Sequence, residues 1–136
     1  MRMKNVIALL LALAWASEAA AVDWVRLMTN VKGDSFSVDL DSESRSGNKI
    51  TAWVKTNYAN IQNHAGNKVL SSAVLYIYNC HNRSYAIKNI VLYSERELKG
   101  GVVSSSNTKD HLLEYSDVVP GSVVEEFHTV LCGSID

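Results

Sequence analysis

The sequence contains little of what marks a nucleic-acid-binding, multidomain or metal-rich protein. Its 136 residues include two cysteines, one proline and seven glycines, and 13 basic residues nearly balance 14 acidic ones. A near-neutral chain with scattered charges lacks the basic surface that attracts nucleic acids or anionic membranes. Neither the single proline nor the scattered glycines mark a linker, so the sequence predicts one domain.

Known catalytic motifs are also missing from the sequence. It has no Gly-x-Ser-x-Gly, no His-Glu-x-x-His and no phosphate-binding glycine loop. Glu125 and His128 have the spacing of half a di-iron carboxylate motif, but such sites need further carboxylates from facing helices. Asp39, Asp41 and Glu43 lack the ligand order and central glycine of a calcium loop. We therefore predict a protein that is not an enzyme and holds no metal or other cofactor.

A long apolar run is present at the N-terminus. Arg2 and Lys4 precede apolar residues 6–15, and small residues follow at 16–21. The run is about half of the ~20 residues that a membrane span requires, so it is typical of a cleavable export signal. We predict a signal peptide at residues 1–21, with cleavage after Ala19 as an alternative.

The predicted mature chain is residues 22–136, a single domain with a net charge of -2. No cysteine follows the cleavage position to carry a lipid. No later apolar run is long enough to span a bilayer. We therefore expect a soluble periplasmic protein, with secretion or surface association as alternatives.

The mature chain reads as strands followed by one helix. Residues 35–40 alternate, with Phe36, Val38 and Leu40 on one face, and residues 69–80 are apolar on both faces, which is typical of a central strand. Residues 59–67 look like a polar loop. The six predicted strands are residues 23–29, 35–40, 49–58, 69–80, 85–94 and 102–106.

The predicted helix begins after Ser122, where Ser122 and Glu125 have the capping-box spacing. Its apolar stripe comprises Val123, Val124, Phe127, Val130 and Leu131. So short a helix is not stable alone, so we expect it to pack on the sheet. The predicted fold class is α+β, an antiparallel sheet of about six strands with one C-terminal helix on a face.

Two cysteines in an exported protein favour a disulfide. Cys80 ends the predicted central strand and Cys132 ends the helix, so a bond between them tethers the helix to the sheet. A zinc site made by both cysteines with His81 and His128 is the alternative. Adjacent residues of a strand point to opposite faces, so Cys80 and His81 do not converge easily on a metal.

The remaining histidines, His64 and His111, lie in polar segments, and we expect the four histidines to be solvated, with His81 and His128 near the disulfide. Tyrosines are the most suggestive candidates for binding, because exposed aromatic residues anchor interfaces. Tyr76 and Tyr78 share a face with Cys80, so we expect these two to pack under the helix.

Several stretches, in order, resemble the surface-adhesin protein E family of Gram-negative exported proteins. They are "DWV", "VDLDSESRSGNKITAWVKTNY", "LYIYNCHNRSYAI" with "VLYS", and "VVPGS" before the terminal helix and Cys132. The resemblance implies a six-stranded antiparallel sheet whose C-terminal helix is held by a Cys80–Cys132 disulfide. It also places Trp24, Trp53, Arg83, Tyr85, Pro120 and Gly121 at recurrent positions of the family.

The resemblance further implies a non-enzymatic binding module that recognises host matrix proteins such as laminin or vitronectin. The adhesin that gives the family its name is lipid-anchored, whereas this chain has no lipidation cysteine. The alternative is a soluble periplasmic structural or envelope-accessory protein with no host ligand. The sequence identifies neither the ligand-binding residues nor the oligomeric state.

Overall fold

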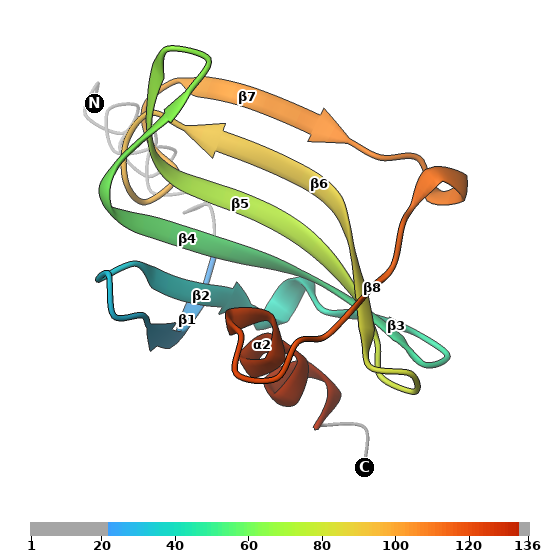
Figure 1. Cartoon of the computed structure of the whole chain (residues 1–136). Coiled ribbons are helices and arrows are strands. Elements are labelled where there is room, and N and C mark those ends of the chain that lie inside the picture. The colour runs from blue at the N-terminus through green and yellow to red at the C-terminus, as the bar shows by residue number, and fades with distance from the viewer. Residues whose placement is uncertain (1–21, 134–136) are drawn as a thin grey trace, which may run out of the picture.

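The computed structural model describes residues 22–133, which form one antiparallel sheet with a helix packed on it (Figure 1). The predicted signal peptide, residues 1–21, lies outside the described residues. Six strands follow the order β1-β2-β4-β5-β6-β7, and two short strands pair at the side, β3 with β4 and β8 with β6. The predicted fold class is confirmed.

The strands are β1 (Trp24–Thr29), β2 (Ser35–Asp39), β3 (Ser44–Ser46), β4 (Lys49–His64), β5 (Asn67–Asn79), β6 (Ser84–Tyr93), β7 (Val102–Asn107) and β8 (Ser116–Asp117). Two 3₁₀ turns, η2 (Leu40–Ser42) and η3 (Asp110–Leu112), and the helix α2 (Val123–Cys132) complete the described elements. None of the described helices is long and apolar enough to cross a membrane.

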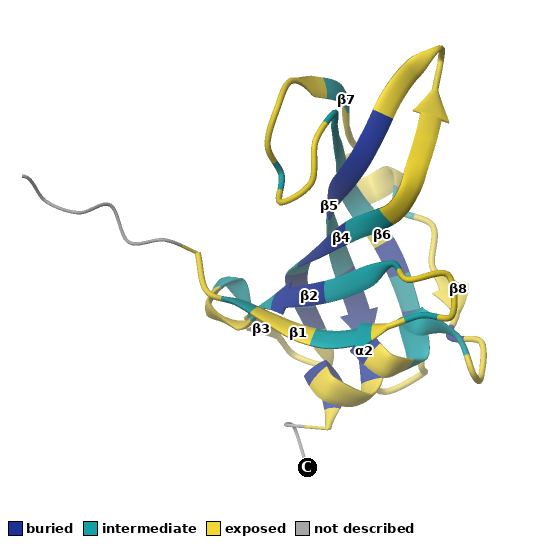
Figure 2. Cartoon of the chain, turned by 90° about the vertical axis from the view of Figure 1, so that its left-hand side faces the viewer, coloured by how far each residue is buried: buried dark blue, intermediate teal, exposed yellow. Residues whose placement is uncertain are grey.

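The core lies between the sheet and α2, where alternate residues of neighbouring strands meet one face of the helix. Ile50 pairs with Tyr78, and both have 0% of their surface exposed. The core cluster comprises Val38, Ile50, Ala52, Val54, Tyr78, Phe127, Leu131 and Cys132. Figure 2 shows this buried region at the helix, whereas the far end of the β4–β5 hairpin is exposed.

The prediction of a polar loop at residues 59–67 is wrong. β4 continues to His64, and His64 pairs with Asn67 across a two-residue turn. Ala65 and Gly66 both have positive φ, 49° and 83°, which is the geometry of a tight hairpin turn. The segment is polar because both of its faces are exposed here, so its composition imitates a loop.

Leu40 does not continue the inner face of β2 as predicted. It lies in η2 and is 41% exposed. The side chain of Asp39 accepts a hydrogen bond from the backbone N–H of Asp41, which turns the chain out of the strand. The polar segment between β2 and β4 contains η2 and β3.

The helix begins as predicted, with Ser122 Oγ accepting from the backbone N–H of Glu125 at 3.3 Å. Glu125 reaches back to the N–H of Gly121 at 3.2 Å rather than to that of Ser122. Phe127 and Leu131 are buried, but Val130 is 41% exposed, contrary to prediction. The buried face instead includes His128 and Cys132, because the helix is rotated so that Cys132 reaches the sheet.

The segment between β6 and β7, residues 94–101, folds against the hairpin end of β4 and β5. We call this segment the β6–β7 latch. Arg96 donates hydrogen bonds to the backbone oxygens of Tyr58 and Ala59 at 3.0 and 2.9 Å. Glu97 accepts from Lys55 Nζ at 2.6 Å, and the side chain of Lys55 is only 8% exposed. Polar contacts therefore hold the β6–β7 latch to this end of the sheet.

Candidate functional site

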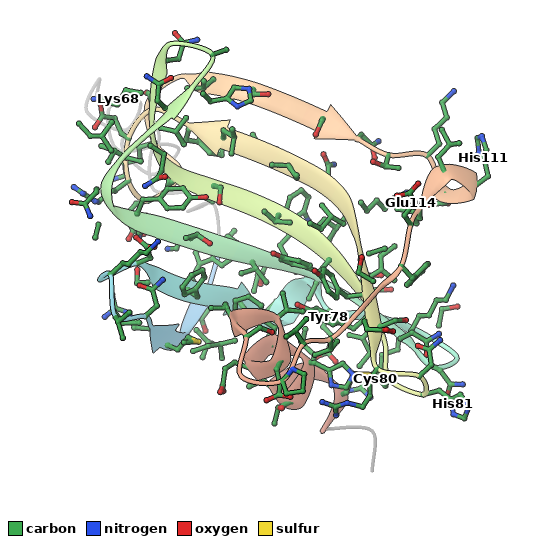
Figure 3. All side chains as sticks on the ribbon, in the orientation of Figure 1. Lys68, Tyr78, Cys80, His81, His111 and Glu114 are labelled. Carbon is green, nitrogen blue, oxygen red and sulfur yellow. A yellow bond between two sulfur atoms is a disulfide. The ribbon has the colours of Figure 1, made fainter. Side chains whose placement is uncertain are left out.

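A disulfide between Cys80 and Cys132 joins the end of β5 to the end of α2. The two Cα atoms are 5.5 Å apart, and the N–H of Cys80 donates to the backbone oxygen of Asn48 at 2.9 Å. Figure 3 shows Cys80 beside the helix, with His81 farther out on the turn that follows β5. The alternative zinc site required both sulfurs as thiolates, and the disulfide occupies them.

A cavity of about 530 Å³ lies beside this disulfide. Three segments that are distant in sequence form it: the turn before β4, the turn between β5 and β6, and the last turn of α2. Its lining residues are Asn48, Cys80, His81, Arg83, His128, Thr129, Cys132 and Gly133. The prediction that His81 and His128 lie near the disulfide is confirmed.

His128 is buried, with 4% of its surface exposed, so the expectation of a solvated side chain is wrong for this residue. Its ring meets that of Tyr78 edge-on at 6.0 Å between centroids. Burial lowers the pKa of His128, and the positive charge of Arg83 lowers it further. A backbone hydrogen bond at Asn79 and the charge of Glu125 act in the opposite direction.

Two buried side-chain polar atoms of the described chain have no hydrogen-bond partner, His128 Nε2 and Tyr78 Oη. A buried polar group without a partner destabilises the protein by about 1–3 kcal/mol. Native proteins contain few such groups, and they often mark functional positions. One lining residue of the cavity, His128, therefore carries a buried nitrogen that has no partner.

Arg83 is held at the cavity by backbone and side-chain contacts. It has a positive φ of 53°, and its backbone oxygen accepts from the N–H of Val118 at 2.9 Å. Its guanidinium donates to Glu125 at 3.2 Å, while 56% of its side chain remains exposed. Glu125 is thus paired with Arg83.

His64 and His111 are exposed and lie away from the cavity. His64 ends β4, and His111 lies in η3, far from His81 in Figure 3. The burial of His128 had one signal in the sequence, since it precedes Cys132 by four residues and so shares its helix face. Asn48 had no signal, because only the sheet pairing brings it to the disulfide.

The family model of surface-adhesin protein E matches residues 24–133, which is most of the chain. The chain belongs to the surface-adhesin protein E family. The family is one of surface adhesins and not of enzymes, so the chain is an adhesin-like surface protein. No curated protein matches this sequence.

Solved structures with the same fold come from this family. One crystal form of Haemophilus influenzae protein E has a TM-score of 0.60 and 16% identity, over 86% of this chain and 95% of that one. Another structure of Haemophilus influenzae protein E has a TM-score of 0.58 and 16% identity, over 86% and 92%. Protein E from non-typeable Haemophilus influenzae has a TM-score of 0.53 and 14% identity, over 86% and 79%. At these identities the likeness concerns the fold.

The recurrent positions of the surface-adhesin protein E family are spread over the structure. Trp24 lies in β1, where the Lys55 ammonium is 5.2 Å from the centre of its ring. Trp53 lies in β4, and Pro120 and Gly121 precede α2. Gly121 has a φ of 79°, which favours glycine. Among these positions, only Arg83 lines the cavity beside the disulfide.

The expected packing of Tyr76 and Tyr78 under the helix is confirmed. The Tyr76 ring lies 6.1 Å from that of Phe127 and 5.6 Å from that of Tyr78. Burial raises the pKa of Tyr76 to about 12, with nearby Tyr85 and Tyr58 adding to the shift. Burial also raises the pKa of Tyr78. Tyr78 is a buried core residue, and Tyr76 is partly buried against the same core.

The acidic cluster at residues 39–43 forms a surface turn, as expected. Asp39 caps η2, and Glu43 accepts from Arg45 at 2.9 Å. No group of three or more His, Cys, Asp or Glu side chains within residues 22–133 is placed to hold a metal. The carboxylate of Asp39 thus bonds the local backbone, and that of Glu43 bonds a neighbouring arginine side chain.

A second cavity of about 270 Å³ lies between β6 and the segment around η3. It is lined by Tyr85, Ala86, Ile87, Thr108, Leu112, Glu114 and Ser116. Neither of the unpartnered buried polar atoms belongs to a residue of this cavity. The larger cavity beside the disulfide is therefore the stronger candidate site.

Proposed function

We propose that this protein is an exported binding module that recognises host extracellular-matrix proteins, with laminin and vitronectin as the first candidates. The observation that carries the proposal is the match of the adhesin family over residues 24–133. A disulfide-tethered helix supports it, because such a tether stabilises a small domain outside the cell, where disulfides persist. The proposal includes export through a cleavable signal peptide at residues 1–21.

Direct binding tests this proposal. The protein is purified after export with its disulfide intact, and its binding to immobilised laminin and vitronectin is measured by surface plasmon resonance. An unrelated glycoprotein serves as the control surface. Saturable binding to laminin or vitronectin, absent from the control, is the expected result, and the proposal fails if neither protein binds.

The alternative is a soluble periplasmic structural or envelope-accessory protein with no host ligand. It rests on the absence of a lipidation cysteine after the predicted cleavage position. Cell fractionation separates the two proposals. Release by osmotic shock, together with no antibody labelling of intact cells, would favour the periplasmic protein, whereas labelling of intact cells would favour the adhesin.

A further inference from the structure

We propose that the cavity beside the disulfide binds the carboxylate of an aspartate or glutamate side chain on a partner protein. The proposal rests on the proposed function as a protein-binding module and assigns one of its contacts. The cavity has the polar chemistry and the volume that such a side chain requires, and one of its lining residues, His128, carries a buried nitrogen without a partner.

The lining of the cavity is rich in nitrogen donors and lacks acidic side chains. Arg83 contributes a guanidinium, His81 and His128 contribute imidazoles, and Asn48 contributes an amide. Arg83 is more than half exposed and shares one nitrogen with Glu125, so its remaining N–H groups are free to donate. A carboxylate accepts from guanidinium and imidazolium groups in short, charge-assisted hydrogen bonds.

His128 provides the decisive contact. Its Nε2 is buried without a partner, while the residue lines the cavity. A carboxylate placed beside this nitrogen stabilises the protonated imidazole and supplies the missing acceptor. Binding then removes the destabilisation that the unpartnered nitrogen causes in the free protein.

The charged groups around His128 set its response to a ligand. Arg83 faces it from the turn between β5 and β6, Glu125 lies one turn earlier on α2, and Tyr78 packs against it from β5. His81 lines the same cavity. The carboxyl end of α2 adds a partial negative charge, so carboxylate binding depends on Arg83 and on protonation of His128.

A single protein carboxylate fits better than a polyanionic chain. A sulfated glycan repeats its charges and binds along a track of basic residues, whereas one guanidinium and two imidazoles form a local site. The predicted mature chain has a net charge of -2, which does not attract polyanions. A volume of about 530 Å³ is within the range of ligand pockets, and the disulfide offers an apolar wall to side-chain methylenes.

The test uses the exported protein with two short probes, acetyl-Gly-Glu-Gly-amide and its glutamine counterpart. Histidine ring signals in NMR spectra are followed during titration and assigned through single histidine-to-glutamine variants. We expect the glutamate probe to shift the signals of His81 and His128 and not those of His64 and His111. The glutamine probe should bind at least about tenfold more weakly than the glutamate probe, because it cannot form the charge-assisted hydrogen bonds.

Binding of the glutamate probe should take up a proton at His128. Affinity should therefore rise as the pH falls from about 8 to about 6, and the binding enthalpy should depend on the ionisation enthalpy of the buffer. His128→Gln should abolish the proton uptake, and Arg83→Gln should weaken binding about tenfold, with partial rescue by Arg83→Lys. His111→Gln, an exposed residue of η3, is the matched control and should bind normally.

The proposal is overturned if the two probes bind equally or if neither shifts His81 and His128. It is also overturned if only a heparin fragment shifts these signals, since the cavity would then bind sulfate groups of a glycan.

Matrix-protein binding separates this inference from the proposed function. If Arg83→Gln and His128→Gln bind laminin or vitronectin as the parent protein does, the cavity assignment fails and the adhesin function stands. If the parent protein binds neither matrix protein and the probe still binds, the proposed function fails alone.

Discussion

The two ends of the sheet are stabilised by different interactions. At the helix end, Phe127 and Leu131 pack into the sheet with 1% of their surface exposed, and the disulfide closes the same interface. At the hairpin end, the β6–β7 latch makes polar contacts with β4 and β5. The N–H of Glu97 donates to Asn57 at 2.8 Å, and that of Leu98 donates to Ser71 at 3.0 Å.

The interactions at the two ends of the sheet also differ in how much each contributes to the free energy of unfolding. Burial of a large apolar side chain contributes about 1.5–3 kcal/mol, whereas a typical intramolecular hydrogen bond adds about 0.5–1.5 kcal/mol net. Segments with exposed backbone hydrogen bonds open locally before the core does. We therefore expect the hairpin end to open in events that leave the helix docked, with faster hydrogen exchange in the latch than in β5.

The largest effect should come from Phe127→Ala at the helix end. Phe127 contacts the rings of Phe36 and Tyr76, at 5.9 and 6.1 Å between centroids. Its truncation should lower the free energy of unfolding by about 3–5 kcal/mol, as for other buried aromatic residues, measured by urea denaturation. Val130→Ala on the exposed side of α2 is the control and should cost less than about 0.5 kcal/mol. An unchanged urea midpoint for Phe127→Ala would show that the helix does not dock through this ring.

Loss of the disulfide should have the next largest effect. The bond links residues 52 positions apart, and a crosslink over such a loop stabilises a protein by about 2–4 kcal/mol. The Cys80→Ala, Cys132→Ala double variant should therefore unfold at lower urea concentration than the parent. Thiol titration of the denatured, unreduced parent protein should detect no free thiol. Detection of two thiols there would contradict the tether.

Glu97→Gln should weaken the hairpin end by a smaller amount. The substitution removes the counter-charge of the mostly buried Lys55 ammonium, while the contact of Lys55 with the Trp24 ring remains. We expect a loss of about 1 kcal/mol and faster hydrogen exchange in residues 94–101. Glu95→Gln is the matched control, because the Lys68–Glu95 pair is about half exposed and should contribute less than about 0.5 kcal/mol. Equal effects of the two variants would contradict the assigned importance of the Lys55–Glu97 pair.

The smallest effect should appear as separate pH dependences of the two ends. Burial lowers the pKa of His128 from its ordinary 6.5, so the unfolded chain binds this proton first, and stability falls as the pH drops below about 6.5 until the folded-state pKa is reached. The hydrogen bond from Lys55 lowers the pKa of Glu97 from its ordinary 4.5. The stability from Glu97 is present above about pH 4.5 and is lost as the pH falls through its folded-state pKa.

Urea denaturation between about pH 7.5 and pH 3.5 checks this separation. His128→Gln should remove the dependence of the upper range, and Glu97→Gln that of the lower range. If the stability of the His128→Gln variant still fell with pH in the upper range, another group would be responsible for that pH dependence. The two variants thereby test each end of the sheet independently.

Much of the fold was predictable because apolar burial leaves a periodic pattern. Alternation placed Ile50, Ala52 and Val54 on the inner face of β4, and helical spacing placed Phe127 and Leu131 on the inner face of α2. The bond between Cys80 and Cys132 followed from their number and compartment. Whether a side chain is buried depends on its position in the strand or helix period, so the apolar pattern of one sequence reveals which side chains are buried.

Only the tertiary structure decided the rest. The polar segment at residues 59–67 pairs as a hairpin, because its partner strand satisfies backbone groups whatever the side chains are. The exact rotation of α2 buried His128 and exposed Val130, since the disulfide and Phe127 set that rotation together. Asn48, Arg83 and His128 meet at one cavity through strand pairing and helix docking. Sequence patterns report which side chains are apolar, and they do not report which polar side chains converge, because that depends on contacts between distant segments.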